Sequence, residues 1–427
     1  MRAFVDLWDE ILLQRYGVED PKFRRFRYGV QVNSLGLTEQ QPENNVYRIL
    51  VEMLAVTLSK KARARAVQLP AWNEALGLPR PWDQQWSMRM QQIMAFETDL
   101  LEYEDLFDGN QVVDAKVESL KASARYELET IETQGGALNA IEYMKSRLVE
   151  SNTDRLQNIE SNHTTVVGVN KFTNTEKSPL VSGDGGIMVV DPSVEKDQID
   201  RLNLWRRKRD EKLVSKALFN LRKAALDGQN IMPTSIEAAK AGATTGEWAQ
   251  EMRNIYGEYR GPTGVAMGIS NKTDGLDELR SAVDAVSDKL GERLKFLIGK
   301  PGLDGHSNGA EQIASRARDC GMKIEYEGIR LTPQELVETV KSTKAHVVGL
   351  SILSGSHIPL VQDMITLLAK EGLTKVPIVV GGIIPEEDKA KLLKMGISKV
   401  YTPKDFEMNS IMMDIVNLAE PREIAAE

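Results

Sequence analysis

The stretch KFLIGKPGLDGHSNG, residues 295–309, decides the fold of the carboxyl-terminal part of the chain. It begins with the apolar run KFLIG and continues into a glycine-rich loop that contains Asp304 and His306. An apolar run that ends at glycine is typical of a strand buried on both faces of a parallel sheet. We therefore predict a buried strand at 295–299, with a loop at its carboxyl end that carries polar side chains.

Four more apolar runs follow this strand and repeat its pattern. They are MKIEYEG (322–328), HVVGLSIL (346–353), VPIVVGG (376–382) and SKVYTP (398–403), and stretches of helical length separate them. Parallel strands need crossovers of about a dozen residues or more, which are usually helices. The sequence therefore predicts an α/β domain at 286–427 with a doubly wound sheet of flavodoxin-like strand order.

The first part of the chain, residues 1–150, also alternates between strand-like and helical stretches. The strand-like runs RYGVQVNS (27–34) and ARAVQLP (64–70) lie on either side of a helical stretch at 44–58. This alternation predicts βα units around a parallel sheet. From about residue 113 the pattern becomes mostly helical and charged.

Residues 151–285 have a mixed pattern and are predicted to be a long linker. They contain a strand-like run, TVVGVNKF (165–172), and a charged helical stretch at 199–228.

Composition excludes several classes of protein. The chain has 427 residues, of which 41% are hydrophobic, and this is enough for two or three domains. Its net charge of -8 disfavours binding to nucleic acid or anionic lipid. Cys320 is the single cysteine, which excludes an internal disulfide and fits a reducing compartment. No apolar run approaches the roughly 18 residues of a membrane span. We therefore expect a cytoplasmic protein with no membrane or nucleic-acid partner.

Unusual residues gather where the predicted strands of the last domain end. In such a sheet, ligands bind outside the carboxyl ends of the strands, at the switch point of the strand order. The residues that the pattern places there are small or polar: Gly305, His306, Ser307 and Gly309 after the first strand, Ser351 and Leu353 at the third, Gly381 and Gly382 at the fourth, and Thr402 after the fifth. These loops predict a crevice that admits a large flat or elongated ligand.

The sequence is compatible with two roles for His306, a structural one and a metal-binding one. A lone histidine in a glycine-rich loop is most often solvated or caps a helix. However, Asp304 lies two residues earlier, so its carboxylate can reach one ring nitrogen and leave the other free for a metal. One protein ligand does not hold a bare zinc ion, but it can supply one axial ligand to a metal held by a macrocycle. Gly309, Gly381, Gly382 and Ser351 also fit ordinary turn, helix-start or core roles when each is taken alone.

Taken together, these residues resemble the signature of the cobalamin-binding domain shared by acyl-CoA mutases, methionine synthase and related corrinoid proteins. The elements that carry the resemblance are Lys300, Asp304-x-His306-x-x-Gly309, Ser351-x-Leu353 and Gly381-Gly382. The resemblance implies that His306 is the lower axial ligand to cobalt and that Asp304 hydrogen-bonds the far ring nitrogen. It also implies that the displaced nucleotide tail of the cofactor passes Ser351 and the paired glycines. Gly305, Ser307 and Thr402 are expected to contact the cofactor as well.

Upstream segments extend the resemblance to the adenosylcobalamin-dependent acyl-CoA mutase family. VQVNSLGLTEQQPENNVYRILVEMLAVTLS (30–59), LPAWNEALGLPRPWDQQWSMRMQQIMAFET (69–98) and VVGVNKF (166–172) are similar to the end of its (β/α)8 barrel and its linker. Methylmalonyl-type members carry a histidine and an asparagine where this chain has Gln68 and Pro70. The likeness is therefore greater to the ethylmalonyl branch. It implies a radical carbon-skeleton isomerisation of a branched acyl-CoA, of the ethylmalonyl-CoA to methylsuccinyl-CoA type.

The length of the first part limits what this chain is expected to do alone. A complete (β/α)8 barrel needs about 250 residues, whereas about 150 precede the predicted linker. We therefore expect an incomplete barrel, either a fragment or one part of a split enzyme, that forms a homodimer or assembles with the missing barrel half. No catalytic residue is assigned. The alternatives are a methylmalonyl-CoA mutase, and a non-catalytic or methyl-carrying corrinoid protein. A receiver-type signalling domain would need an acceptor aspartate where the chain has LSILSG (350–355).

Overall fold

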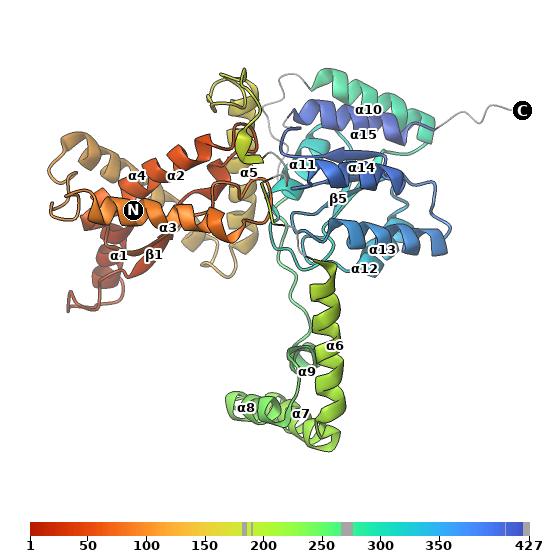
Figure 1. Ribbon diagram of the computed structural model, residues 1–427, viewed down its shortest axis with the longest axis horizontal. Helices are drawn as coiled ribbons and strands as arrows, with labels where there is room; N and C mark the ends of the chain where they lie inside the picture. The colour runs from red at the N-terminus through yellow and green to blue at the C-terminus, as the bar shows by residue number, and fades with distance from the viewer. Residues whose placement is uncertain (182–185, 189–190, 266–275, 406, 422–427) are drawn as a thin grey trace, which may run out of the picture. The chain divides into compact units, whose positions relative to one another are not determined.

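The computed structural model describes residues 1–181, 186–188, 191–265, 276–405 and 407–421. The chain divides into two compact units (Figure 1). The first unit comprises Met1–Met188 and Pro262–Glu427, and the second comprises Val189–Gly261. None of the helices in the described residues is long and apolar enough to cross a membrane.

The last domain is built on one parallel sheet. Its strands are β3 (Lys295–Gly299), β4 (Lys323–Tyr326), β5 (Val347–Ser351), β6 (Ile378–Gly381) and β7 (Lys399–Tyr401). They lie in the order β4-β3-β5-β6-β7, and each neighbouring pair is parallel. Numbered along the chain within the domain, the strands therefore lie in the order 2-1-3-4-5. The predicted flavodoxin-like order is confirmed. All of the predicted strands are present, and KFLIG has the predicted bounds.

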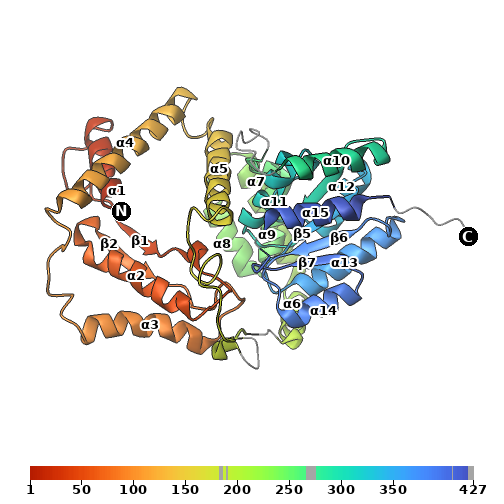
Figure 2. The ribbon, with the colours of Figure 1, turned by 90° about the horizontal axis from the view of Figure 1, so that it is seen from above.

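Helices cover both faces of this sheet (Figure 2). On one face lie α10 (Asp277–Leu290), α11 (Asn308–Asp319) and α15 (Met408–Ala419); on the other lie α12 (Pro333–Thr343), α13 (His357–Lys370) and α14 (Glu386–Lys394). Alternate residues of each strand face opposite layers. Phe296 therefore packs in the first layer and Leu297 in the second. Since both faces are buried at the centre of the sheet, β3, β5 and β6 are mostly apolar, whereas the edge strands β4 and β7 also carry charged residues.

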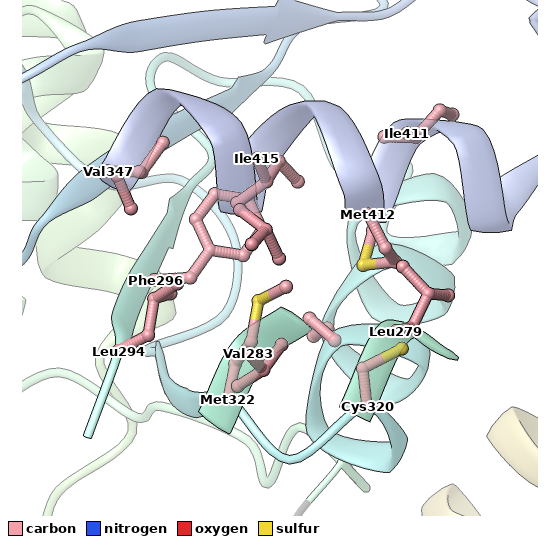
Figure 3. Close-up of a cluster of buried hydrophobic side chains, with 14 of the residues drawn as sticks. Leu279, Val283, Leu294, Phe296, Cys320, Met322, Val347, Ile411, Met412 and Ile415 are labelled. Carbon is pink, nitrogen blue, oxygen red and sulfur yellow. The ribbon is translucent and has the colours of Figure 1, made fainter. Parts of the chain in front are cut away.

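The first layer holds the larger aromatic and sulfur-containing core (Figure 3). Phe296 of β3 and Val347 of β5 pack with Ile415 of α15, and Met322 and Cys320 belong to the same cluster. Cys320 is completely buried, and burial raises the pKa of its thiol to about 11. A buried neutral thiol is a poor nucleophile and metal ligand. Cys320 is therefore a core residue.

The amino-terminal part contains a second, smaller sheet. Strands β1 (Tyr28–Gln31) and β2 (Ala64–Gln68) are parallel, and α2 (Asn44–Leu58) lies between them in the chain. Ile49 and Met53 of α2 are fully buried against this pair. This is the βαβ arrangement predicted for the region, and the predicted helix at 44–58 is confirmed with the same bounds. The remaining helices of this part are α1 (Arg2–Gln14), α3 (Pro81–Phe96), α4 (Gln111–Thr133), α5 (Ile141–Glu160) and the short 3-10 turns η1 (Ser34–Gly36), η2 (Lys60–Ala62) and η3 (Pro179–Val181).

One strand prediction in this region is wrong. TVVGVNKF (165–172) forms a turn whose ends, Val167 and Lys171, share a single isolated bridge. Asn170 accounts for the difference, because its side-chain amide accepts from the Val166 N–H and donates to the carbonyls of Ile159 and Thr164. Side-chain hydrogen bonds of this kind favour turns over strand pairing.

The described residues of the second unit form four helices: α6 (Pro192–Lys208), α7 (Glu211–Leu226), α8 (Met232–Ala241) and α9 (Thr245–Tyr256). The charged stretch predicted as one helix at 199–228 is therefore two helices. The break falls at Arg209 and Asp210, because the Asp210 side chain accepts from the backbone N–H groups of Lys212 and Leu213 and caps α7. Arg209 then forms two hydrogen bonds with Glu247 of α9, at 2.7 and 2.6 Å.

We expect Glu247→Gln to destabilise this unit by about 1 to 2 kcal/mol at pH 7, since the Arg209 side chain is only 6% exposed and would keep only the exposed Glu211 as an anionic partner. The Arg209 hydrogen bonds lower the pKa of Glu247 to about 2. Because this folded-state pKa lies below the unfolded value of about 4.3, the stabilisation is complete above about pH 5 and is lost as the pH falls towards 2. The difference between wild type and variant should shrink over the same range. Hydrogen exchange of the α9 amides measures this difference. Glu237→Gln on α8 is the control, because the exposed Glu237 side chain has no hydrogen-bond or ion-pair partner among the described residues.

Candidate functional site

His306 lies in the loop between β3 and α11, at the carboxyl end of the sheet. Its ring Nδ1 is 2.7 Å from Oδ1 of Asp304, and its backbone N–H donates to the same oxygen at 3.0 Å. The side chain of His306 is 80% exposed, whereas that of Asp304 is 5% exposed. The predicted Asp304 to His306 contact is therefore present, and the ring lies in solvent and not in the core.

The buried side chain of Lys300 positions the Asp304 carboxylate. Its Nζ donates to Oδ2 of Asp304 at 2.7 Å and approaches the backbone carbonyl of Ser351 at 3.4 Å. Lys300 is fully buried. The Leu353 N–H also donates to Oδ2 of Asp304, at 3.3 Å. The Asp304 carboxylate thus joins the loop after β3 to the loop after β5, across the switch point of the sheet.

These hydrogen bonds fix the charge of Asp304 and the tautomer of His306. Burial alone would raise the pKa of the Asp304 carboxyl, but the hydrogen bonds from Lys300 and His306 hold that pKa well below its usual range. An ionised carboxylate only accepts hydrogen bonds. Nδ1 of His306 therefore carries the proton that it donates to Asp304, and Nε2 is left as the ring nitrogen that can bind a metal. A neutral imidazole held in this way is a metal ligand of raised basicity.

A cavity of about 250 Å³ opens beside this loop, between the sheet and the helices α11 and α15. Its lining is mostly apolar and includes Phe296, Ile313 and Ile415. Several predicted site residues line it: Gly309, Ser351, Leu353, Gly381, Gly382 and Thr402. The predicted residues thus fall into two neighbouring sets. One set lines the cavity. The other lies in or next to the loop between β3 and α11, called the ligand loop below, and comprises Lys300, Asp304, Gly305, His306 and Ser307.

The paired glycines at the end of β6 have different roles. A Cβ built on Gly381 meets nothing within 4 Å, so the missing side chain leaves the cavity open. Gly382 has a φ of +157°, and a Cβ there would lie 1.8 Å from the carbonyl oxygen of Ile352. Only glycine fits this backbone approach. Gly382 therefore shapes the wall, and Gly381 provides space.

The other predicted residues have mainly structural contacts. Thr402 is buried, and its backbone N–H donates to Asp405 at 2.8 Å while its hydroxyl accepts from Lys404 at 3.3 Å. Ser307 is the residue before α11 and makes no capping hydrogen bond with its side chain. Sequence reasoning missed most of the cavity wall, including Ala310, Ile313, Tyr401, Met408 and Ile411. Apolar residues at helical spacing give no signal that separates a cavity wall from a core.

The remaining histidines of the domain have structural partners. His346 accepts from the Lys295 N–H through Nδ1, and buried His357 contacts Asp388 at 2.9 Å. Among the described residues, no group of three or more His, Cys, Asp or Glu side chains is arranged to hold a metal ion. His306 is thus a single exposed ligand, which fits a metal whose other positions are filled by a macrocycle and does not fit a bare ion.

Family models match both halves of the chain. Residues 1–258 match the model described as methylmalonyl-CoA mutase, and residues 294–403 match the B12 binding domain. The chain belongs to the methylmalonyl-CoA mutase family. The sheet domain with the His306 loop is its B12-binding domain, and the resemblance to cobalamin-dependent acyl-CoA mutases is confirmed.

Curated relatives place the chain within this mutase family. It is 68% identical to the ethylmalonyl-CoA mutase of Cereibacter sphaeroides, over 100% of this chain and 65% of that protein. It is 59% identical to the ethylmalonyl-CoA mutase of Methylorubrum extorquens, over 98% of this chain and 61% of that protein. It is 30% identical to the methylmalonyl-CoA mutase of Escherichia coli, over 98% of this chain and 59% of that protein. The greater likeness to the ethylmalonyl branch is confirmed, and the chain spans less than two thirds of the length of these relatives.

Proposed function

We propose that the chain binds adenosylcobalamin with His306 as the lower axial ligand to cobalt. The observation that carries this proposal is the exposed Nε2 of His306, whose ring is oriented through Nδ1 by the buried Asp304 and Lys300 pair. Ser307 and Gly305 flank the ligand on the same loop. The nucleotide tail of the cofactor would occupy the cavity lined by Gly309, Ser351, Leu353, Gly381, Gly382 and Thr402.

The cavity suits a tail of this kind for two reasons. It is mostly apolar and lies between sheet and helices, so it can cover a flat heterocyclic base. It also opens next to the ligand loop, because Leu353 and Ser351 contact the Asp304 and Lys300 pair directly. One cofactor molecule would therefore place its macrocycle on His306 and its nucleotide tail in this cavity.

We propose that the reaction is the isomerisation of ethylmalonyl-CoA to methylsuccinyl-CoA, with the acyl-CoA as substrate. The 68% and 59% identities to ethylmalonyl-CoA mutases support this choice over methylmalonyl-CoA. Bound adenosylcobalamin supplies radical chemistry through its cobalt–carbon bond, and the protein supplies position and exclusion of water. We propose that residues 1–150 are the mutase barrel segment, 151–285 the linker and 286–427 the cofactor domain of a cytoplasmic enzyme; α10, which packs on the cofactor domain, begins within the linker range.

We propose further that turnover requires a partner, either a second copy or the part of the mutase that this chain does not span. Within the described residues, β1 and β2 pair only with each other. Large apolar side chains of this part lie in solvent, among them Phe23, Tyr47, Val51 and Phe96, each at least 65% exposed. Unpaired strand edges and exposed apolar side chains are both features that a partner would cover.

An isomerisation assay tests the reaction. The chain is loaded with adenosylcobalamin and supplied with ethylmalonyl-CoA or methylmalonyl-CoA, alone and together with the remaining part of the Cereibacter sphaeroides relative. We expect ethylmalonyl-CoA to be converted only when that part is present. Conversion of methylmalonyl-CoA but not of ethylmalonyl-CoA would show that the proposed substrate is wrong. Methyl transfer without isomerisation would instead identify a corrinoid carrier.

Asp304→Asn should weaken cobalamin binding by about 10 to 100-fold, the usual effect of changing the partner of a metal-ligating histidine. An amide still accepts from Nδ1 of His306, but it presents no charge to Lys300, which is fully buried. Spectroscopic titration with cobalamin measures the change. Asp363→Asn, at an exposed position on α13, is the control. Equal affinities of Asp304→Asn and wild type would argue against the role of Asp304.

A further inference from the structure

Arg330 lies in the loop between β4 and α12, and its backbone is in an unfavourable conformation. Its φ is +61°, in the left-handed region, which costs most residues with a side chain about 1 to 2 kcal/mol. Arg63 and Lys344 share this feature, but both end a helical turn, where left-handed residues are common. Arg330 ends no helix. A strained residue held by its surroundings is a reason to look for a role of its side chain.

Backbone hydrogen bonds hold Arg330 next to the His306 loop. The Leu331 N–H donates to the Lys300 carbonyl at 3.1 Å, and the Gly302 N–H donates to the Leu331 carbonyl at 2.9 Å. Leu331 itself is buried, and Thr332 then caps α12. The loop after β4 is thus tied on both sides of Leu331 to the start of the ligand loop. This arrangement fixes where the Arg330 side chain begins.

The guanidinium of Arg330 lies against the ligand loop. A Cβ built on Gly305 would be 3.4 Å from Nη2 of Arg330, so the guanidinium rests beside the residue that joins Asp304 to His306. Arg330 is exposed, and within the described part of the chain its guanidinium has no hydrogen-bond or ion-pair partner. The nearby Asp304 is already bonded to Lys300, Leu353 and His306. The guanidinium thus lies beside the His306 loop with N–H donors that no described residue uses.

The same loop also presents an apolar side chain. Leu303 is 90% exposed, between the buried Pro301 and the buried carboxylate of Asp304. Exposed apolar surface beside a free ligand atom suits a flat, largely apolar ring with polar groups on its rim. Arg330 and Leu303 supply the two kinds of contact that such a ring needs.

We infer that Arg330 is a cofactor-contacting residue that donates hydrogen bonds to amide carbonyl oxygens on the rim of the corrin ring. This inference rests on the proposed binding of cobalamin at His306. The nucleotide tail with its phosphate is the other acceptor in the cofactor, but the tail cavity lies along β3, β5 and β6. Arg330 follows β4, on the opposite side of β3 from β5. The position of Arg330 therefore favours the corrin rim over the phosphate.

Arg330→Gly is the test, because glycine adopts a φ of +61° freely and the variant should fold at least as well as wild type. We expect it to bind cobalamin about tenfold more weakly, with an unchanged or raised unfolding midpoint. Cobinamide, which lacks the nucleotide tail and its phosphate, should show the same loss. Lys344→Gly is the matched control: it removes a cation with a φ of +55° at the other end of the sheet, before β5, and should leave the dissociation constant unchanged.

The outcomes separate this inference from the proposed function. If wild type does not bind cobalamin, the proposed function fails. If wild type binds and Arg330→Gly binds both corrinoids equally well, the inference is overturned while the proposed function stands. A loss for cobalamin that disappears with cobinamide would place the contact on the phosphate and overturn the corrin assignment.

Discussion

Purified protein loaded with cobalamin is expected to show the base-off, histidine-on absorption spectrum, and His306→Ala is expected to abolish it. The variant removes the only exposed imidazole of the loop and leaves Asp304 bonded to Lys300 and Leu353, so the fold of the loop should persist. Changing the partner of a metal-ligating histidine already costs about 10 to 100-fold in affinity. We therefore expect loss of the ligand itself to weaken binding by about 100-fold or more.

Two further measurements decide whether this loss reflects coordination. Free imidazole added to His306→Ala should restore part of the spectral change, because it can occupy the space of the deleted ring. His163→Ala is the control, since His163 is exposed and, in the described residues, its side chain hydrogen-bonds only to Ser161. A variant at 306 that kept the wild-type spectrum would eliminate His306 as the cobalt ligand.

Gly381→Leu is the second change with a large expected effect. Its side chain would enter the cavity of about 250 Å³, because no atom lies within 4 Å of a Cβ at this position. Overfilling a packed site typically costs about 1 to 3 kcal/mol, and 1.4 kcal/mol corresponds to a tenfold change in affinity. We expect cobalamin to bind about 10 to 100-fold more weakly, as measured by spectroscopic titration.

The corrinoid without a tail provides the comparison for this variant. Cobinamide should bind Gly381→Leu as well as it binds wild type, because it places nothing in the cavity. Gly246→Leu is the control, since Gly246 lies in α9 of the second unit and a Cβ there also meets nothing within 4 Å. An equal loss of affinity for both corrinoids would show that the substitution disturbs the fold and would remove the evidence for a tail cavity.

The ligand loop was predictable because its chemistry is local. Asp304 and His306 are two residues apart, and the short loop between β3 and α11 allows one direct contact between them. The contacts that complete the site are not local. Lys300 reaches Ser351, and Leu353 reaches Asp304, only because β3 and β5 are neighbours in the sheet. Arg330 had no signal in the sequence, since its role follows from the backbone pairing of Leu331 with Lys300 and Gly302.

The sequence by itself determined the parallel sheet and the identity of the ligand loop, because apolar periodicity and residue spacing act over short distances along the chain. It did not separate helices 192–208 and 211–226, or show that 165–172 is a turn, because side chains of Asp210 and Asn170 decide both. Only the tertiary structure decided which residues form the cavity. Apolar residues of α11 and α15 have the same pattern whether they meet a neighbouring side chain or a cavity, and only their packing distinguishes the two.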